Sequence, residues 1–502
     1  MIIDVHVHAL QHGGQDTLPE VTRHGGRCGL SLALVSMGGS GIPAYPTPQE
    51  VRANNDGALD FVQRGGQFCR FLAYLNPQNA DWRAELDRCL EAGAVGVKLW
   101  TAFKDEQGRM DNAVTLLREC GKRGLAVLIH TWQKTQGNAR GEITVPELAT
   151  LAEAAPDTLL VGAHSGGNWR HTLGVLRGRL PNAHLDCSGY YPERGLVEAL
   201  AADVGPERVL FGSDLAGRSL AGQLAKVALA DLSDADKALI MGGNAARVFG
   251  LKDIPAPLSV PLRPMDEMPD FAVEHFCFAG PWPCYRGPWA TPEELDDRLA
   301  AAGIETAYTG DFATLFRQDL ERANNEFLDA ARKCRRIAPL ATLNPLAHNW
   351  RSTLRLLRKE FAGAVVFPYV HNWKLDAPEY AEFFRALADA GLPVWINCAL
   401  ADDRTRPAGV DWRPVRADEV VAFCQSGPLN DYVFQGLPGH VAGKALQSAA
   451  DGSRLRFDAS KLTDYGYAWD GFVWTHGLDN LVMGSEFPLR HLEETRWAAR
   501  RV

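Results

Sequence analysis

The first half of the chain alternates short apolar runs with longer amphipathic stretches. In the first run, residues 2–7, Ile3, Val5 and Val7 occupy every second position, which is the period of a β-strand. Further runs of strand length lie at residues 31–37, 71–75, 95–99, 126–130, 159–164, 184–186 and 209–212. Between such runs, residues 80–92 and 110–123 carry apolar side chains at helical spacing.

This alternation predicts the fold of the first half. Strands and helices that alternate over about 250 residues are typical of a (β/α)₈ barrel. A doubly wound open sheet is the alternative, although no glycine-rich phosphate turn follows the first strand.

The second half repeats the first. Residues 253–268 contain too many prolines for a helix or a central strand, so we predict a linker there. Beyond it, the tetrapeptides that begin at Arg52 (RANN) and Ala92 (AGAV) return at Arg322 and Ala362, an offset of 270 residues in both cases. The chain is therefore predicted to be an α/β protein of two tandem (β/α)₈ barrels, residues 1–252 and 269–502.

Polar side chains stand at the ends of the predicted strands of the first barrel. Asp4, His6 and His8 alternate with the first apolar run and leave one face of that strand, where two imidazoles can bind the same metal ion. Four further strand ends carry one such residue each: Lys98, His130, His164 and Asp214. Because the strand ends of a barrel converge on one mouth, the sequence predicts an active site at that mouth.

Composition and charge narrow the class of protein. The chain of 502 residues is 46% hydrophobic and 23% charged, which is typical of a soluble globular protein. A net charge of −9 argues against nucleic acid as a partner, and no apolar run reaches the roughly 18–20 residues of a membrane helix. The start lacks the basic region of a signal peptide, and the ten cysteines include no CxxC pair. We therefore expect reduced thiols, a cytoplasmic protein and a small-molecule substrate.

The site residues resemble a known family. Asp-x-His-x-His on the first strand, a histidine ending the fifth and sixth strands, and Gly-Ser-Asp after the eighth are similar to the amidohydrolase superfamily. The phrases VLFGSD and GGNAARVFGL resemble its branch that contains the aminocarboxymuconate-semialdehyde-type decarboxylases.

This resemblance, over residues 1 to about 252, implies a divalent ion, commonly zinc, on four residues: His6, His8, His130 and Asp214. His164 would bind a second ion or contact the substrate. Lys98 resembles the carbamylated lysine that bridges the ions of two-metal members, whereas the decarboxylase-like branch usually holds one ion. One Zn²⁺, two with a carbamylated Lys98, or another divalent ion are the alternatives.

These residues predict a reaction as well as a metal. A bound ion lowers the pKa of a water to about 7, and Asp214 would take the proton of that water and deliver it to a leaving group. A second ion or a protonated His164 would polarise the scissile carbonyl. Arg170 and Arg218 are candidates for binding a substrate carboxylate. We expect a hydrolase acting on a C–N or C–O bond of an amide, lactone or ester, with non-oxidative decarboxylation as the alternative and a non-catalytic ligand-binding scaffold as the second alternative.

The second barrel lacks these ligands at the corresponding positions. The offset of 270 places Phe276 and Phe278 where His6 and His8 stand, and Asn397 corresponds to His130. Phenylalanine cannot bind a metal ion, so we predict a metal-free pseudo-enzyme barrel. It would act as an internal partner of the first barrel in a pseudo-dimer, and further homo-oligomerisation is left open.

Overall fold

The computed structural model describes residues 1–502 except 11–15, 40–45, 101–108, 140, 190, 283, 285, 286, 288, 358, 359, 401, 408, 453, 466 and 467. The chain divides into two compact units. Unit 1 comprises Met1–Leu262, Asp402–Arg406 and Arg501–Val502, and unit 2 comprises Arg263–Ala401 and Pro407–Arg500. The main division therefore falls within residues 253–268, where the sequence predicts the linker.

Unit 1 is built on a parallel sheet of eight strands in the order β1-β2-β3-β4-β5-β6-β7-β8. The strands are β1 Ile3–Leu10, β2 Leu32–Gly39, β3 Cys69–Leu75, β4 Gly96–Leu99, β5 Val127–Ile129, β6 Leu160–Gly162, β7 Ala183–Asp186 and β8 Val209–Leu210. The sheet curls into a barrel, because Val5 donates a backbone hydrogen bond to Phe211 (3.1 Å) and Val7 pairs with Leu215. The (β/α)₈ prediction is confirmed, and the open sheet is wrong.

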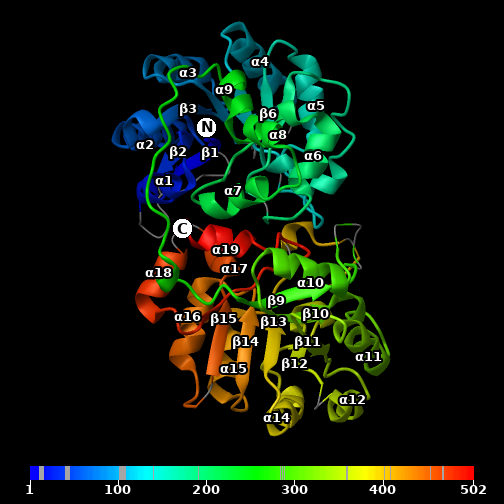
Figure 1. The fold of residues 1–502 in the computed structure, drawn as a ribbon. Helices are drawn as coiled ribbons and strands as arrows, with labels where there is room; N and C mark the ends of the chain where they lie inside the picture. The colour runs from blue at the N-terminus through cyan, green and yellow to red at the C-terminus, as the bar shows by residue number, and fades with distance from the viewer. Residues whose placement is uncertain are drawn as a thin grey trace. The chain divides into compact units, whose positions relative to one another are not determined.

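Helices follow the strands of unit 1 and lie around the sheet (Figure 1). They are α1 Gly25–Cys28, α2 Pro48–Gly65, α3 Trp82–Glu91, α4 Arg109–Lys122, α5 Val145–Ala154, α6 Leu196–Val204, α7 Leu220–Ala228, α8 Asp234–Ala238 and α9 Asn244–Val248. A buried cluster joins Ile3, Val5 and Leu128 of the strands to Val248 and Phe249 at the end of α9. This apolar core holds the strand ends in place.

Unit 2 has the same architecture, with neighbouring strands in the order β9 to β16. Its strands are β9 Val273–Ala279, β10 Thr306–Asp311, β11 Ile337–Thr342, β12 Gly363–Val366, β13 Val394–Asn397, β14 Asp431–Gln435, β15 Arg454–Asp458 and β16 Leu481–Val482. Its helices are α10 Pro292–Ala301, α11 Leu320–Ala331, α12 Trp350–Leu357, α13 Pro368–His371, α14 Ala381–Asp389, α15 Ala417–Ser426, α16 Gly439–Ser448, α17 Ser460–Asp464, α18 Ala468–His476 and α19 Glu494–Ala499. The prediction of a second barrel is confirmed.

A recurring sequence starts helices in both units. Thr47 before α2 and Thr291 before α10 are each followed by proline and, three residues on, by Glu50 or Glu294. Each threonine accepts a hydrogen bond from the backbone of its glutamate, which in turn accepts one from the threonine backbone. This reciprocal cap satisfies amide groups that the first helical turn leaves without partners, so the motif fixes where these helices begin.

One carboxylate ties the first strand of each barrel to its last. Asp4 Oδ1 accepts hydrogen bonds from the backbone nitrogens of His6 (3.0 Å) and Ser213 (2.9 Å). In unit 2, Glu274 Oε1 accepts from Phe276 (3.0 Å) and Ser485 (2.8 Å) in the same way. Asp4 therefore links the two ends of the unit 1 sheet and helps to close the barrel, and Glu274 does the same in unit 2.

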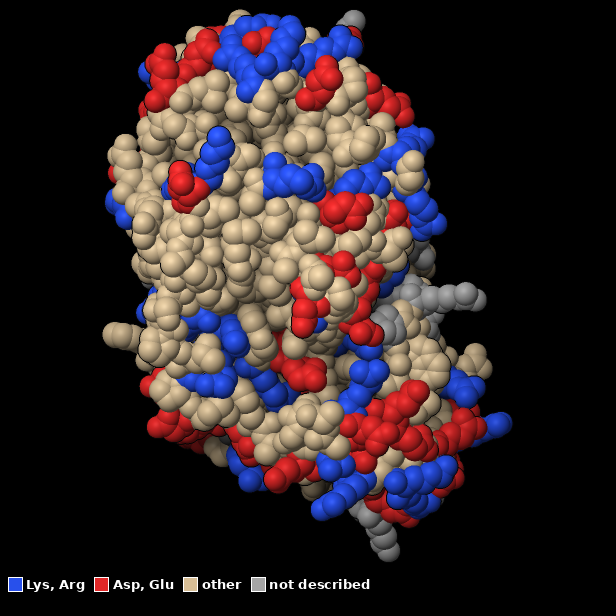
Figure 2. Space-filling model, turned by 45° about the horizontal axis from the view of Figure 1, so that its top comes forward, with Lys and Arg blue, Asp and Glu red and all other residues tan. Residues whose placement is uncertain are grey.

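The surface carries charges of both signs. On the face shown in Figure 2, Lys and Arg side chains lie beside Asp and Glu side chains, with broad uncharged areas between them. None of the helices in the described part of the chain combines the length and apolar content needed to cross a membrane.

Candidate metal centre

Three predicted ligands converge at the mouth of the unit 1 barrel. His6 and His8 project from β1, and Asp214 follows β8. Asp214 Oδ1 lies 3.4 Å from His8 Nε2 and 3.8 Å from His6 Nε2. The two imidazole rings are 4.9 Å apart at an interplanar angle of 81°. A single ion could therefore contact one atom of each side chain.

A second carboxylate, Asp186 at the end of β7, orients His6. Its Oδ2 lies 2.9 Å from His6 Nδ1, and its Oδ1 accepts from the backbone nitrogens of His164 (2.8 Å) and Ser188 (2.9 Å). Burial alone would raise the pKa of Asp186, but the charge and hydrogen bond of His6 hold it well below its usual range. Asp186 therefore fixes His6 with its Nε2 atom toward Asp214, as carboxylates commonly do for metal-binding histidines.

Sequence reasoning did not select Asp186 as a site residue. It ends the predicted strand 184–186 and so satisfies the rule that selects His130 and Asp214. His6, His164 and Asp186 also form a cluster that could hold an ion, which overlaps the cluster of His6, His8 and Asp214.

His130 and His164 stand together beside this cluster. His130 Nδ1 lies 3.1 Å from His164 Nε2, and the His164 ring is 4.9 Å from the His6 ring. On its other side, His130 Nε2 lies 3.4 Å from Oε1 of Glu142, which also accepts from Lys134 Nζ (2.8 Å). Glu142 lies in the segment between β5 and α5, and no sequence pattern predicts its role. Its contact sets the orientation of the His130 ring.

Unusual backbone angles aim two of the side chains. His164 has φ 59° and Asp214 has φ 63°, a left-handed conformation that costs energy for residues with a side chain. Such residues cluster where the surrounding structure compensates for the strain, as at functional sites. His164 lies two residues after the end of β6 and Asp214 four residues after the end of β8, so the turns after these strands direct both side chains into the mouth.

Lys98, on β4, lies within the same cluster. Its Nζ atom is 2.7 Å from His6 Nε2, and its side chain is fully buried. Burial lowers the pKa of Lys98 to about 8, although Asp186 and Asp214 oppose this shift. The predicted mouth therefore contains all six predicted residues that end its strands, Lys98 included.

The electrostatics favour the protonation states that bind a cation. Burial and the neighbouring Lys98 charge lower the pKa of His6 to about 4, and burial lowers that of His164 well below 6.5. Burial opposes ionisation of Asp214, but its hydrogen bond to His8 and the nearby histidines hold its pKa well below 3.8. At neutral pH the site thus presents His6 and His164 as neutral imidazoles and Asp214 as an ionised carboxylate.

The two predicted arginines are each paired with a carboxylate. Arg170 forms an ion pair with Glu193, and its guanidinium lies 4.1 Å from the centre of the Trp169 ring. Arg218 lies 3.5 Å from Asp402. Their role in substrate binding stays a prediction.

Comparison with known proteins identifies the barrel. The family model described as amidohydrolase matches residues 3–251. Residues 3–251 belong to the amidohydrolase family. The match covers every predicted metal and substrate residue.

A curated relative of this chain is the 2-amino-3-carboxymuconate-6-semialdehyde decarboxylase of Dictyostelium discoideum, 24% identical over 205 residues. The match covers 33% of this chain and 56% of the relative, so the chain spans little more than half of the relative's length. Similar solved structures include the 2,6-dihydroxybenzoate decarboxylase from Rhizobium, with 16% identity, a TM-score of 0.39, and coverage of 50% of this chain and 98% of that one. Another is the 5-carboxyvanillate decarboxylase from Sphingomonas paucimobilis, with 18% identity, a TM-score of 0.35, and coverage of 44% and 79%.

The donor set of the amidohydrolase barrel fits a divalent ion. Two imidazole nitrogens and a carboxylate oxygen suit zinc and related borderline ions, and three protein ligands leave open coordination positions. The geometry fits too, because the donor atoms of His6, His8 and Asp214 all lie within 4.8 Å of one another.

The corresponding mouth of unit 2 is chemically different. Phe276 and Phe278 of β9 are buried with ring centres 5.3 Å apart, and the Phe278 ring stacks on Phe312 at 4.1 Å. Glu486, in the place of Asp214, is fully buried, and burial raises the pKa of its carboxyl to about 8. That this barrel binds no metal stays a prediction.

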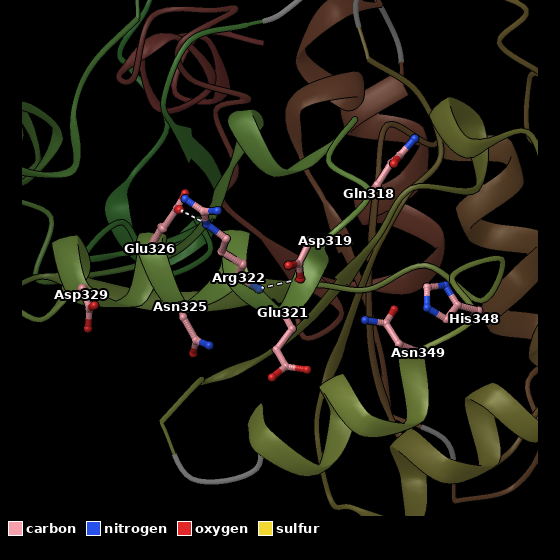
Figure 3. Close-up of a pocket in the computed structure, with 9 residues that line it drawn as sticks. All are labelled: Gln318, Asp319, Glu321, Arg322, Asn325, Glu326, Asp329, His348 and Asn349. Carbon is pink, nitrogen blue, oxygen red and sulfur yellow. Dashed lines mark hydrogen bonds and ion pairs between the residues drawn. The ribbon is translucent and has the colours of Figure 1, made fainter.

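Unit 2 also has an open hollow of about 820 Å³ on its outer helices. Figure 3 shows Arg322 of α11 between Asp319 and Glu326, bonded to Asp319 through its backbone (3.1 Å) and to Glu326 through its side chain (2.8 Å). The side chains around it come from α11, from the two residues before α11 and from the two residues before α12, and none of them is a predicted site residue. We therefore assign no chemistry to this hollow.

Proposed function

We propose that unit 1 is a metal-dependent decarboxylase that removes a carboxyl group from a small conjugated acid without an oxidant. The observation that carries the proposal is the convergence of His6, His8 and Asp214 within an amidohydrolase barrel. The curated relative of that barrel is named as a decarboxylase of a carboxylated muconate semialdehyde, which suggests the substrate class.

His6, His8 and Asp214 would hold the ion, with His130 and His164 as candidates for further positions. We propose zinc, because imidazole and carboxylate donors suit it, and one ion, because His6, His8 and Asp214 offer three donor atoms within 4.8 Å of one another. When bound, the ion supplies positive charge that binds anionic oxygens of the substrate and stabilises the electron pair left by the departing CO₂.

Asp214 is proposed to carry the proton. Breaking the bond to the carboxyl carbon leaves an electron pair on the substrate carbon, which must receive a proton as CO₂ departs. Asp214 starts ionised, takes a proton from an acidic group of the substrate or from water, and returns it to that carbon. His164 lies 3.1 Å from His130 through Nε2 and 3.1 Å from the Ser188 hydroxyl through Nδ1, so it is held to position the reacting group.

Hydrolysis of an amide, lactone or ester is the second candidate. One observation favours it: an ionised Asp214 beside His8 is the form that a general base for an attacking water requires.

The test is to assay the purified full-length protein on two panels, conjugated and aromatic acids for CO₂ release and amides and lactones for hydrolysis. We expect CO₂ release that is lost on chelation and restored by Zn²⁺. Hydrolysis alone would replace the proposal with the second candidate. Binding of acids without turnover of either panel would favour a ligand-binding scaffold. The variant H440A, at an exposed histidine of unit 2, is the matched control.

A further inference from the structure

A short segment that follows the unit 2 strand β13 in sequence belongs to unit 1. Asp402–Arg406 groups with unit 1 by its contacts, and it includes the single turn Asp403–Thr405. Asp402 caps this turn by accepting from the Arg404 backbone nitrogen (3.0 Å). The Arg404 carbonyl accepts from the backbone nitrogen of Thr135 (3.0 Å), which follows β5 of unit 1. The backbone of the segment is thus fixed in unit 1.

The Arg404 side chain is held by three kinds of contact. Its Nε and Nη2 donate to the two oxygens of Asp402 (2.9 and 2.7 Å) in a fork, and its guanidinium lies 4.0 Å from the centre of the Trp132 ring. Nη2 also donates to the carbonyl of Gly189 (3.3 Å). A bidentate carboxylate and an aromatic face together fix the plane of a guanidinium, so this arginine is preorganised.

These contacts bring Arg404 next to the metal centre. The Trp132 ring lies 5.0 Å from the His164 ring. Gly189 has φ 66°, and a Cβ atom there would lie 2.3 Å from His164 Nδ1 and 2.7 Å from Asp214 Oδ2. The backbone that Arg404 contacts therefore touches both His164 and Asp214.

Arg404 also remains accessible. Its side chain is 40% exposed, whereas that of Asp402 is 7% exposed and that of Arg218 13%. Asp402 lies between the two arginines, 3.5 Å from Arg218 Nη2. The buried carboxylate of Asp402 thus orients the Arg404 guanidinium, and part of the Arg404 side chain remains exposed to solvent.

We propose that Arg404 determines specificity by binding a second anionic group, a carboxylate, of a substrate whose reacting carboxyl lies at the metal centre. The inference rests on the proposed function for the identity of the reaction, but it concerns binding and can be tested without turnover. A guanidinium carries a permanent positive charge and donates charge-assisted hydrogen bonds to carboxylate oxygens, which is why arginine is suited to this task. Asp402 is then a positioning residue, since it contacts Arg404 and not the substrate.

The test measures binding of benzene-1,3-dicarboxylate and benzoate to the full-length protein by titration calorimetry, in the presence of Zn²⁺. We expect the wild type to prefer the dicarboxylate, and R404A to weaken dicarboxylate binding by roughly 10–100-fold while leaving benzoate unchanged, because a charge-assisted hydrogen bond is lost. R404K keeps the positive charge but loses the paired hydrogen bonds of the guanidinium, so its affinity for the dicarboxylate should lie between those of the wild type and R404A. D402N should weaken dicarboxylate binding less than R404A does.

Equal dicarboxylate affinity of R404A and wild type, or no preference of the wild type for the dicarboxylate, would overturn the inference. R416A removes an exposed arginine paired with Asp418 in unit 2 and should bind both probes as the wild type does. Metal content and circular dichroism of each variant exclude loss of the fold. If the binding pattern holds while no acid releases CO₂, the proposed reaction fails and the role of Arg404 stands.

Discussion

His6 Nδ1 and Asp186 Oδ2 lie 2.9 Å apart in the barrel mouth, and both side chains are fully buried. This pair leaves Nε2 of His6 as the atom that faces His8 and Asp214. The metal centre therefore depends on a residue that would not itself need to bind the ion.

The variant D186N tests this relationship. An amide still fits the space, but it lacks the charge that holds the imidazole, so we expect metal affinity to fall by about 10–100-fold with the fold retained. Competition with a chelator of known affinity measures the change. An unchanged affinity would show that Ser188, 2.9 Å from the same nitrogen, is sufficient to orient His6.

Removing both β1 histidines should remove the ion. H6A/H8A eliminates two of the three converging donors, so we expect elemental analysis to find less than a tenth of the wild-type metal. The double variant H348A/H440A changes two exposed histidines of unit 2 and should keep the full complement. Undiminished metal in H6A/H8A would place the ion elsewhere in the chain.

The sequence predicts the barrel and its mouth because both depend on local patterns. The period-two alternation of β1 places His6 and His8 on one face of the strand. Closure of the eight strands into a barrel then brings them to the mouth. The internal repeat is detectable because it too is a local pattern. Matching the RANN at Arg52 with the RANN at Arg322, however, places α2 and α11 one residue out of structural alignment. Asn55 of α2 bonds both backbone groups of Tyr74 (2.9 and 2.8 Å), and Asn324 of α11 bonds Thr342 in the same way, an offset of 269.

Contacts between distant parts of the chain could not be predicted. Arg404 and Gly189 are 215 residues apart, and no periodicity connects them. Glu142 lies in a loop, whose conformation depends on tertiary packing instead of a repeating pattern. The pairing of Arg218 with Asp402 likewise follows from the three-dimensional fold.

Lys98 decides between one ion and two. Its Nζ atom lies 2.7 Å from His6 Nε2, and His6, His8 and Asp214 form one cluster of donor atoms, so we expect one ion per chain, whether or not bicarbonate is present, and one ion in K98M. Elemental analysis of both proteins, prepared with and without bicarbonate, gives the counts. Two ions in the wild type with bicarbonate and one in K98M would establish the carbamylated lysine.

Glu486 should make the stability of unit 2 depend on pH between about 4.5 and about 8. Burial raises its pKa from 4.5 to about 8, so the folded state holds a proton that the unfolded state releases above pH 4.5. The free energy of unfolding should therefore fall as the pH rises from about 4.5 to about 8. E486Q, which is neutral at every pH, should lose this part of the dependence. Urea unfolding of both proteins at pH 6 and pH 9 measures it, and equal changes between the two pH values would contradict the assignment.

Asp214 carries the proposed chemistry, and D214N separates its two roles. The amide is nearly the same size, so the barrel should fold, and His6 and His8 should still hold an ion with reduced affinity. The amide cannot take up and return a proton at neutral pH, and proton transfer by a positioned group is typically worth about 10²–10⁴-fold. We therefore expect kcat to fall by at least 10²-fold at saturating Zn²⁺, with the metal content measured on the same sample. A metal-loaded D214N enzyme that turns over within about threefold of the wild type would mean that another group transfers the proton. His164 is the side chain placed to do so, because it lies beside Asp214 at Gly189: a Cβ atom added to Gly189 would be 2.3 Å from His164 Nδ1 and 2.7 Å from Asp214 Oδ2.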